Sequence, residues 1–160
     1  MPICIIYHSE TGNTKKVAKA VAAATGADLI EVKTVFHYSM MAMYTTGINK
    51  ARKGELDEIE QTEIDVSGYD LIVVGTPVWA FHPTPAINAA VSALSGCEGK
   101  RAVVFETDAG IPKNTLKILS KQLTEKGMSV AGTVGISGKE INNKEKTGVL
   151  IELVNSLRQI

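Results

Sequence analysis

The stretch ICIIYHSETGNT, residues 3–14, joins an apolar run to a polar turn and then to a helix. Residues 3–7 form a continuous apolar run, which is typical of a parallel strand covered on both faces. Val17, Val21 and Ala24 follow at helical spacing. The stretch therefore predicts a β-strand, a tight turn and an α-helix in direct succession.

The same succession of apolar run, turn and helical stripe recurs along the chain. Short apolar runs predict further strands at 29–32, 71–74, 102–105 and 130–136. Strands that alternate with helices imply right-handed crossovers and a parallel sheet. The sequence therefore predicts an α/β fold in three layers, with a doubly wound, five-stranded parallel sheet between two layers of helices.

Length and charge limit the function classes. The 160 residues suit one domain, which we expect to span residues 1–160. Lys and Arg total 17, as do Asp and Glu, so the formal net charge is +0. Binding to nucleic acid or to a membrane surface calls for a basic excess, which is missing. We therefore expect no nucleic-acid partner and no membrane partner.

Cysteine usage and the first residues bear on the compartment. Cys4 and Cys97 have no metal-ligand spacing, so they are expected to be reduced thiols, with Cys4 as a small buried side chain. Residues 1–6 lack the basic region of a secretion signal, and no apolar run reaches the length of a membrane span. These features predict a cytoplasmic protein.

Residues 34–68 are the least regular part of the sequence. One helix is predicted over about 40–53, followed by a loop into the third strand. Met40, Met41 and Met43 are interpreted as core contacts of that helix. The segment is alternatively a lining for a substrate space.

Ligands of open parallel sheets bind beyond the carboxyl ends of the strands, where the strand order reverses. This rule directs attention to three loops, at residues 9–14, 76–85 and 106–113. The first holds three hydroxyls and Gly12, which permits a tight turn and close approach of a ligand. Helix amides without internal partners, the helix dipole and the hydroxyls together form a neutral anion site.

Other phosphate-loop signatures are absent from the sequence. The first loop has neither the Gly-Lys-Ser/Thr of a Walker loop nor the Gly-x-Gly-x-x-Gly of a dinucleotide fingerprint. One alternative remains, in which Thr11 or Asn13 merely caps the helix.

Two of these loops carry a family resemblance. SETGNT, residues 9–14, resembles the FMN-phosphate loop of the flavodoxin family. GTPVW, residues 75–79, followed by Pro83 and Pro85, is similar to that family's Gly-x-Pro-x-Trp loop. The resemblance covers essentially the whole chain and implies a flavodoxin-like fold with strand order 2-1-3-4-5 and FMN as cofactor.

The resemblance also implies the cofactor-binding residues. Trp79 is the expected wall for the flavin ring, with a core or surface aromatic as the alternative, and Phe81 either shields the ring or packs under the next helix. The third loop is expected to meet the pyrimidine edge through backbone amides, but no Tyr lies between residues 106 and 113. Two alternatives follow for the faces of the ring: Trp79 stacks alone, or a Tyr or Phe from residues 36–44 covers the second face. The predicted set is Ser9, Glu10, Thr11, Gly12, Asn13, Thr14, Thr76, Pro77, Val78, Trp79, Ala80, Phe81, Thr107, Asp108, Ala109 and Gly110.

Three functions stay open. The first is an electron carrier that shuttles between a reductase and an acceptor, docking transiently as a monomer or weak homodimer. The second is an FMN-dependent oxidoreductase, such as a quinone reductase or a protoporphyrinogen-oxidase-like protein, which the balanced charge favours because carriers of this family are usually acidic. The third is a flavin-free binding module. No catalytic residue and no metal site is predicted.

Overall fold

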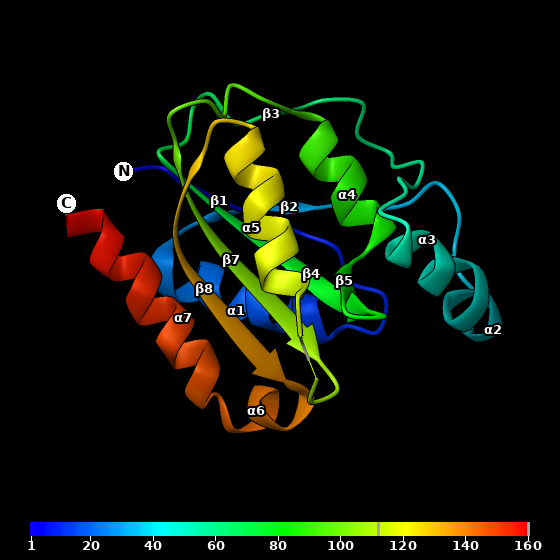
Figure 1. The fold of residues 1–160 in the computed structure, drawn as a ribbon. Coiled ribbons are helices and arrows are strands. Elements are labelled where there is room, and N and C mark those ends of the chain that lie inside the picture. Colours follow the sequence, from blue (N-terminus) through cyan, green and yellow to red (C-terminus); the bar gives the residue numbers. More distant parts are fainter. Residues whose placement is uncertain (112, 160) are drawn as a thin grey trace.

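A computed structural model describes residues 1–111 and 113–159. Pro112, within the predicted third loop, and Ile160, at the end of the predicted domain, lie outside the described residues. Figure 1 shows strands and helices alternating along the chain, as predicted. The elements are β1 Ile3–Tyr7, α1 Asn13–Thr25, β2 Asp28–Glu31, α2 Met40–Ala42, the π-helical turn η1 Met43–Gly47, α3 Ile48–Arg52, β3 Ile64–Asp65, β4 Leu71–Trp79, β5 His82–Pro83, α4 Pro85–Ser92, β6 Leu94–Ser95, β7 Arg101–Asp108, α5 Thr115–Glu125, β8 Ser129–Ser137, α6 Gly138–Asn143, α7 Glu145–Ser156 and the 3₁₀ turn η2 Leu157–Gln159.

The main sheet has the predicted strand order. Its five principal strands run β2-β1-β4-β7-β8, and every neighbouring pair is parallel. Renumbered by principal strand, this is the order 2-1-3-4-5, so the predicted flavodoxin-like α/β topology is confirmed. Short β5 adds an antiparallel pair to the end of β4, and β3 with β6 forms a separate two-stranded sheet.

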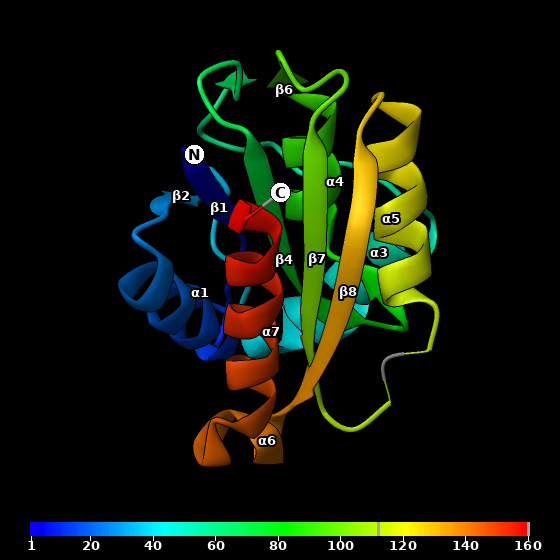
Figure 2. The same cartoon turned by 90° about the vertical axis from the view of Figure 1, so that its left-hand side faces the viewer.

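Helices cover both faces of the sheet. Figure 2 shows α1 and α7 in front of one face and α4 and α5 behind the other. Successive strand residues alternate between two cores: Ile5 packs with the α1 and α7 side, and Ile6 packs with the α4 and α5 side. Burial on both faces is the reason the strands are continuous apolar runs. Cys4 is buried in the second core and, like Cys97, is a free thiol, as predicted.

The carboxyl ends of β1, β4 and β7 meet at one edge of the sheet. Two strands are longer than predicted, because β4 continues to Trp79 and β7 to Asp108. Thr76–Trp79 and Glu106–Asp108, predicted as loop residues, are therefore strand residues. Ladder hydrogen bonds along β4 and β7 thus hold these candidate site residues more rigidly than loops would.

The predicted helix over 40–53 forms with a distortion. α2, η1 and α3 follow one another without a break, and η1 is a π-helical turn. The interpretation of the methionines as core contacts is wrong for Met40 and Met41, which are 66% and 79% exposed. Only the face that carries Gly47 and Ala51 is buried, so the methionine side chains on the other faces stay in solvent.

Candidate functional site

The first loop turns sharply into α1. Gly12 precedes the helix with a φ of 97°, in the left-handed region that favours glycine. The Ser9 hydroxyl accepts hydrogen bonds from the amides of Gly12 and Lys15, each at 3.2 Å. The alternative in which Thr11 or Asn13 caps the helix is therefore not what the structure shows, since Ser9 has that role. Lys15 pairs with Glu31 on β2 at 3.1 Å, which turns its charge away from the loop.

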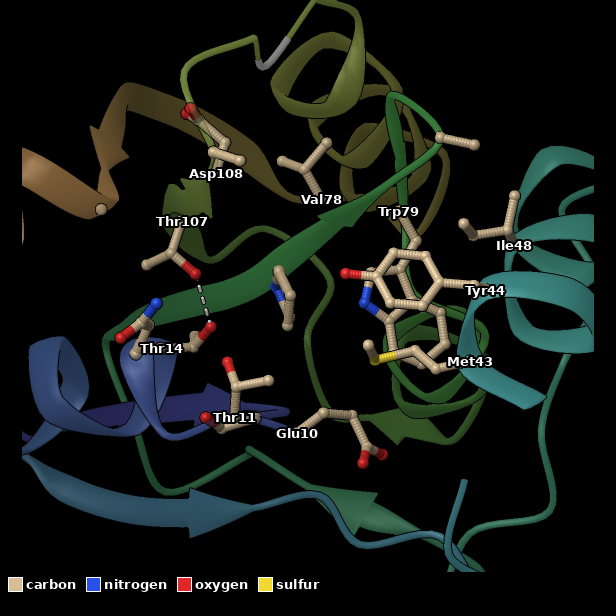
Figure 3. Close-up of a pocket in the computed structure, with 16 residues that line it drawn as sticks. Glu10, Thr11, Thr14, Met43, Tyr44, Ile48, Val78, Trp79, Thr107 and Asp108 are labelled. Carbon is tan, nitrogen blue, oxygen red and sulfur yellow. Dashed lines mark hydrogen bonds between the residues drawn. The ribbon is translucent and has the colours of Figure 1, made fainter. Parts of the chain in front are cut away.

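Thr14 links the first loop to the third. Its hydroxyl lies 2.7 Å from the Thr107 hydroxyl, and both residues are buried. Figure 3 draws this hydrogen bond at one end of a cavity. The bond holds the start of α1 against the end of β7 and keeps two polar groups together at the cavity wall.

A cavity of about 490 Å³ lies where the three loops meet. Twelve of the sixteen predicted cofactor-binding residues line it, from all three loops. These are Ser9, Glu10, Thr11, Asn13, Thr14, Pro77, Val78, Trp79, Ala80, Thr107, Asp108 and Ala109. The structure thus brings together side chains that lie up to a hundred residues apart in the sequence.

Four predicted residues do not line the cavity. Thr76 is fully buried, and its hydroxyl donates to the Pro77 carbonyl at 2.8 Å and accepts from the Thr84 amide at 3.2 Å. Phe81 lies 39% exposed, and the Lys113 ammonium is 4.5 Å from its ring centroid. Gly12 shapes the turn into α1, as described above. The Gly110 amide donates to the Asp108 carboxylate.

Four lining residues lie outside the predicted cofactor-binding set, although the sequence left the segment 34–68 open as a lining. Met43, Tyr44 and Ile48 come from the helical segment 40–52, and Gly138 is the first residue of α6. The methionines and tyrosines of this segment were a signal, because large apolar side chains beside charged residues suggest a lining role. Gly138 gave no signal in the sequence.

Trp79 is enclosed by protein. It is only 7% exposed, and the Tyr38 ring meets it edge-on at a centroid distance of 5.3 Å and an interplanar angle of 89°. The His8 ring lies 6.0 Å away, also edge-on, and is held by Thr84. Gly47 fits against the indole so closely that a Cβ there would lie 2.8 Å from Cζ3. The indole therefore fastens the β4–β5 hairpin to the helical segment.

A polar cluster around the buried Asp57 carboxylate reinforces this contact. The Tyr38 hydroxyl donates to both carboxylate oxygens of Asp57, at 2.8 and 2.9 Å, and Lys50 of α3 forms an ion pair with the same carboxylate. Burial, followed by the bonded Asp57 carboxylate, raises the pKa of Tyr38 far above its ordinary value. The phenol therefore stays neutral and holds α3 in place.

Charge at the cavity is acidic. Glu10 and Asp108 are the two charged side chains among the residues that line it. Behind the wall, Glu106 of β7 is fully buried, and neither carboxylate oxygen has a hydrogen-bond partner among the described residues. Burial first, and then Asp108 and Glu140, raise the pKa of Glu106 from 4.5 to about 9. This carboxyl is therefore neutral near pH 7.

Residues 1–111 and 113–159 also bear on metal binding and on membrane spanning. These residues contain no cluster of three or more His, Cys, Asp or Glu side chains arranged to hold a metal ion. In the same part of the chain, none of the helices combines the length and the apolar character required to traverse a bilayer.

Solved structures share this fold at low identity. A candidate flavoprotein from Bacteroides eggerthii is 24% identical, with a TM-score of 0.71 over 89% of this chain and 94% of that one. A Lactobacillus acidophilus flavoprotein in complex with FMN is 23% identical, with a TM-score of 0.67 over 89% and 97%. Two-electron reduced Megasphaera elsdenii flavodoxin is 18% identical, with a TM-score of 0.64 over 94% and 96%.

A search of the curated proteins gave no significant match. The model of the flavodoxin family, in contrast, matches residues 2–157, which is nearly the whole chain. Fold, loop sequences and family model agree, and the chain therefore belongs to the flavodoxin family.

Proposed function

We propose that the chain binds one FMN noncovalently and carries electrons between a reductase and an acceptor. One observation carries this proposal: a single cavity joins the neutral, hydroxyl-rich start of α1 to an apolar space beside the β4–β5 hairpin. The first part suits a phosphate monoester and the second a flat conjugated ring. The L. acidophilus flavoprotein, which shares the fold, was solved with FMN.

The residues present fit the parts of this cofactor. Thr11, Thr14 and the first amides of α1 would hold the phosphate with neutral donors. Backbone groups of residues 107–109 would meet the polar edge of the ring, and residues 77–80 would lie along its body. FMN, when bound, supplies one- and two-electron chemistry, and the protein supplies orientation and electrostatics.

The charges at the cavity support a low-potential carrier. Glu10 and Asp108 disfavour added negative charge on a bound ring, which makes the last electron harder to add. Among residues 1–111 and 113–159, no lysine or arginine lines the cavity to offset them, although Nε2 of His8 lies 3.0 Å from the Glu10 carboxylate. Such a cofactor gives its electrons away readily, as a carrier requires.

A second candidate is an FMN-dependent oxidoreductase, such as a quinone reductase or a protoporphyrinogen-oxidase-like enzyme. Met43, Tyr44 and Ile48 favour it, because they add an apolar wall that a small substrate would contact. The balanced charge of the chain also favours it, since carriers that dock by charge usually bear an excess of one sign. Under the carrier proposal, docking is transient, the protein is cytoplasmic, and it acts as a monomer or weak homodimer without nucleic acid or membrane.

Spectroscopy and turnover separate these functions. The freshly purified protein should show a flavin absorption spectrum, and mass spectrometry of the released cofactor should identify one FMN per chain. Slow oxidation of NAD(P)H alone, with fast electron exchange once a reductase is added, supports the carrier. Steady reduction of a quinone by NAD(P)H without any partner supports the enzyme. A colourless protein that ignores added FMN would refute both.

A further inference from the structure

We propose that Tyr44, with Met43 beside it, is the aromatic wall for the flavin ring, and that Trp79 has a supporting role. This inference rests on the proposed FMN site. It assigns the main ring contact to Tyr44, one of the aromatic residues of 36–44 that the sequence left as a possible second contact, and not to Trp79.

Trp79 already has its contacts within the protein. Tyr38 and His8 meet the indole edge-on, and the backbone of Gly47 lies against the six-membered ring. Only 7% of the residue remains exposed. Little indole surface is therefore left for a ligand ring to stack on.

The third loop offers no aromatic side chain. Thr107, Asp108 and Ala109 are its contributions to the cavity lining. The remaining aromatic residue of the hairpin, Phe81, lies outside this cavity and contacts Lys113. Apart from the enclosed Trp79, a ring bound in this cavity therefore has no aromatic partner among the described residues that follow β4 and β7.

Tyr44 is the aromatic residue with a free surface at the cavity. It is 64% exposed and lines the cavity together with Met43 and, one helical turn later, Ile48. In Figure 3, the segment that bears these residues lies at the end of the cavity away from Thr14 and Thr107. A phosphate held at the start of α1 would therefore direct the rest of the ligand toward Tyr44.

The helical segment is built to hold Tyr44 in place. The π-helical turn presents Gly47 to Trp79 and Tyr44 to the cavity within four residues. The ion pair of Lys50 with buried Asp57 anchors the following helix. A flat ring that covers Tyr44 would also bury apolar surface that is unusually exposed in this segment.

Titration of FMN into flavin-free protein tests the assignment, with the dissociation constant and the emission of bound flavin as readouts. Tyr44→Ala should raise the Kd about tenfold and increase the emission, because a stacked phenol is lost. Tyr44→Phe should restore both. Met41→Ala, on the same segment but outside the lining, should change neither, and Trp79→Phe should change the Kd less than Tyr44→Ala does.

An unchanged Kd and emission in Tyr44→Ala, while the parent protein binds FMN, would overturn this assignment alone. A larger Kd increase in Trp79→Phe than in Tyr44→Ala would return the ring contact to the tryptophan. Failure of the parent protein to bind FMN would overturn the proposed function and the wall with it. If the circular dichroism spectra of the parent protein and Tyr44→Ala match, a loss of FMN affinity is due to the missing ring contact and not to misfolding. We expect the spectra to match, because Tyr44 is 64% exposed.

Discussion

Thr14 combines a structural contact with a candidate ligand contact in one hydroxyl. Thr14→Val keeps the shape of the side chain and removes the hydroxyl that faces Thr107 and the cavity. FMN affinity should fall by about 1–2 kcal/mol, because one phosphate donor is lost. Riboflavin has no phosphate, so its affinity should be nearly unchanged. Parallel fluorescence titrations with the two flavins measure this difference.

Thr107→Val is the matched control for Thr14. It breaks the same 2.7 Å hydrogen bond from the other side but leaves the first loop intact. FMN and riboflavin should then respond alike to Thr107→Val. If Thr14→Val lowered the affinities for FMN and riboflavin equally, the first loop would not be a phosphate site.

The buried Glu106 carboxyl should make the stability of the folded chain depend on pH. Its pKa in the folded chain is raised from 4.5 to about 9, chiefly by burial. Between these values the unfolded chain releases a proton that the folded chain keeps, so the free energy of unfolding falls as pH rises. The fall is at most about 1.4 kcal/mol per pH unit. It ends above about pH 9, where both states are ionised.

Glu106→Gln should remove this pH dependence. Urea unfolding at pH 5, 7 and 9 should show the variant gaining stability relative to the parent protein as pH rises. Glu152→Gln, at an exposed position of α7, is the control and should differ from the parent by a constant amount. A constant difference for Glu106→Gln as well would show that its carboxyl is not held neutral.

Among the elements, the β4–β5 hairpin stores backbone strain beside the cavity. Its two turn residues, Ala80 and Phe81, have φ values of 50° and 67°, which non-glycine residues rarely adopt. Ala80→Gly should therefore raise the free energy of unfolding by about 1 kcal/mol, since the left-handed conformation costs alanine about that much. Thermal or urea unfolding, followed by circular dichroism, measures the change.

An Ala→Gly substitution within a helix should instead lower the free energy of unfolding. Ala23 is an exposed residue within α1, where Ala→Gly should cost about 0.5–1 kcal/mol. Destabilisation of similar size by Ala80→Gly and Ala23→Gly would mean that the hairpin turn is relaxed. Strain at this turn, which borders the candidate ring space, would fit a preorganised site.

At the element scale, some features were readable from sequence and others were not. Both ends of strand β1 were predicted correctly, because burial on both faces makes the strand uniformly apolar. The end of β7 was missed because Glu106 reads as a loop residue. Its burial depends on Gly135 of the neighbouring strand β8, where a Cβ would lie 2.4 Å from the carboxylate. A contact between strands 29 residues apart leaves no local signal.

At the scale of the whole molecule, too, some features could be predicted from the sequence and others could not. The parallel sheet and the meeting of three loops followed from the alternation of strands and helices, whereas the strand order followed from the family resemblance. The enclosure of Trp79 and the position of Tyr44 at the cavity did not follow, because periodicity does not tell which face of a short helix packs inward. The π-helical turn η1 further shifts that face and leaves Met40 and Met41 in solvent.

Because all three loops contact the cavity, a ligand there should stabilise the entire domain. A ligand that binds only the folded chain adds about 2.7 kcal/mol of stability at a hundred times its Kd. For a chain of this size, each kcal/mol corresponds to about 2–4 °C of unfolding midpoint. FMN at a hundredfold excess over its Kd should therefore raise the midpoint by about 5–10 °C, as measured by circular dichroism.

Comparison with riboflavin then divides this stabilisation between the parts of the cavity. Riboflavin at the same concentration should raise the midpoint less than FMN does, since it leaves the start of α1 without an anion. AMP offers a phosphate on a different ring and should give a smaller shift than either flavin, because the space beside Tyr44 and Val78 would be poorly filled. Equal shifts with FMN and AMP would mean that the cavity recognises phosphate alone, and the apolar half would then need another role.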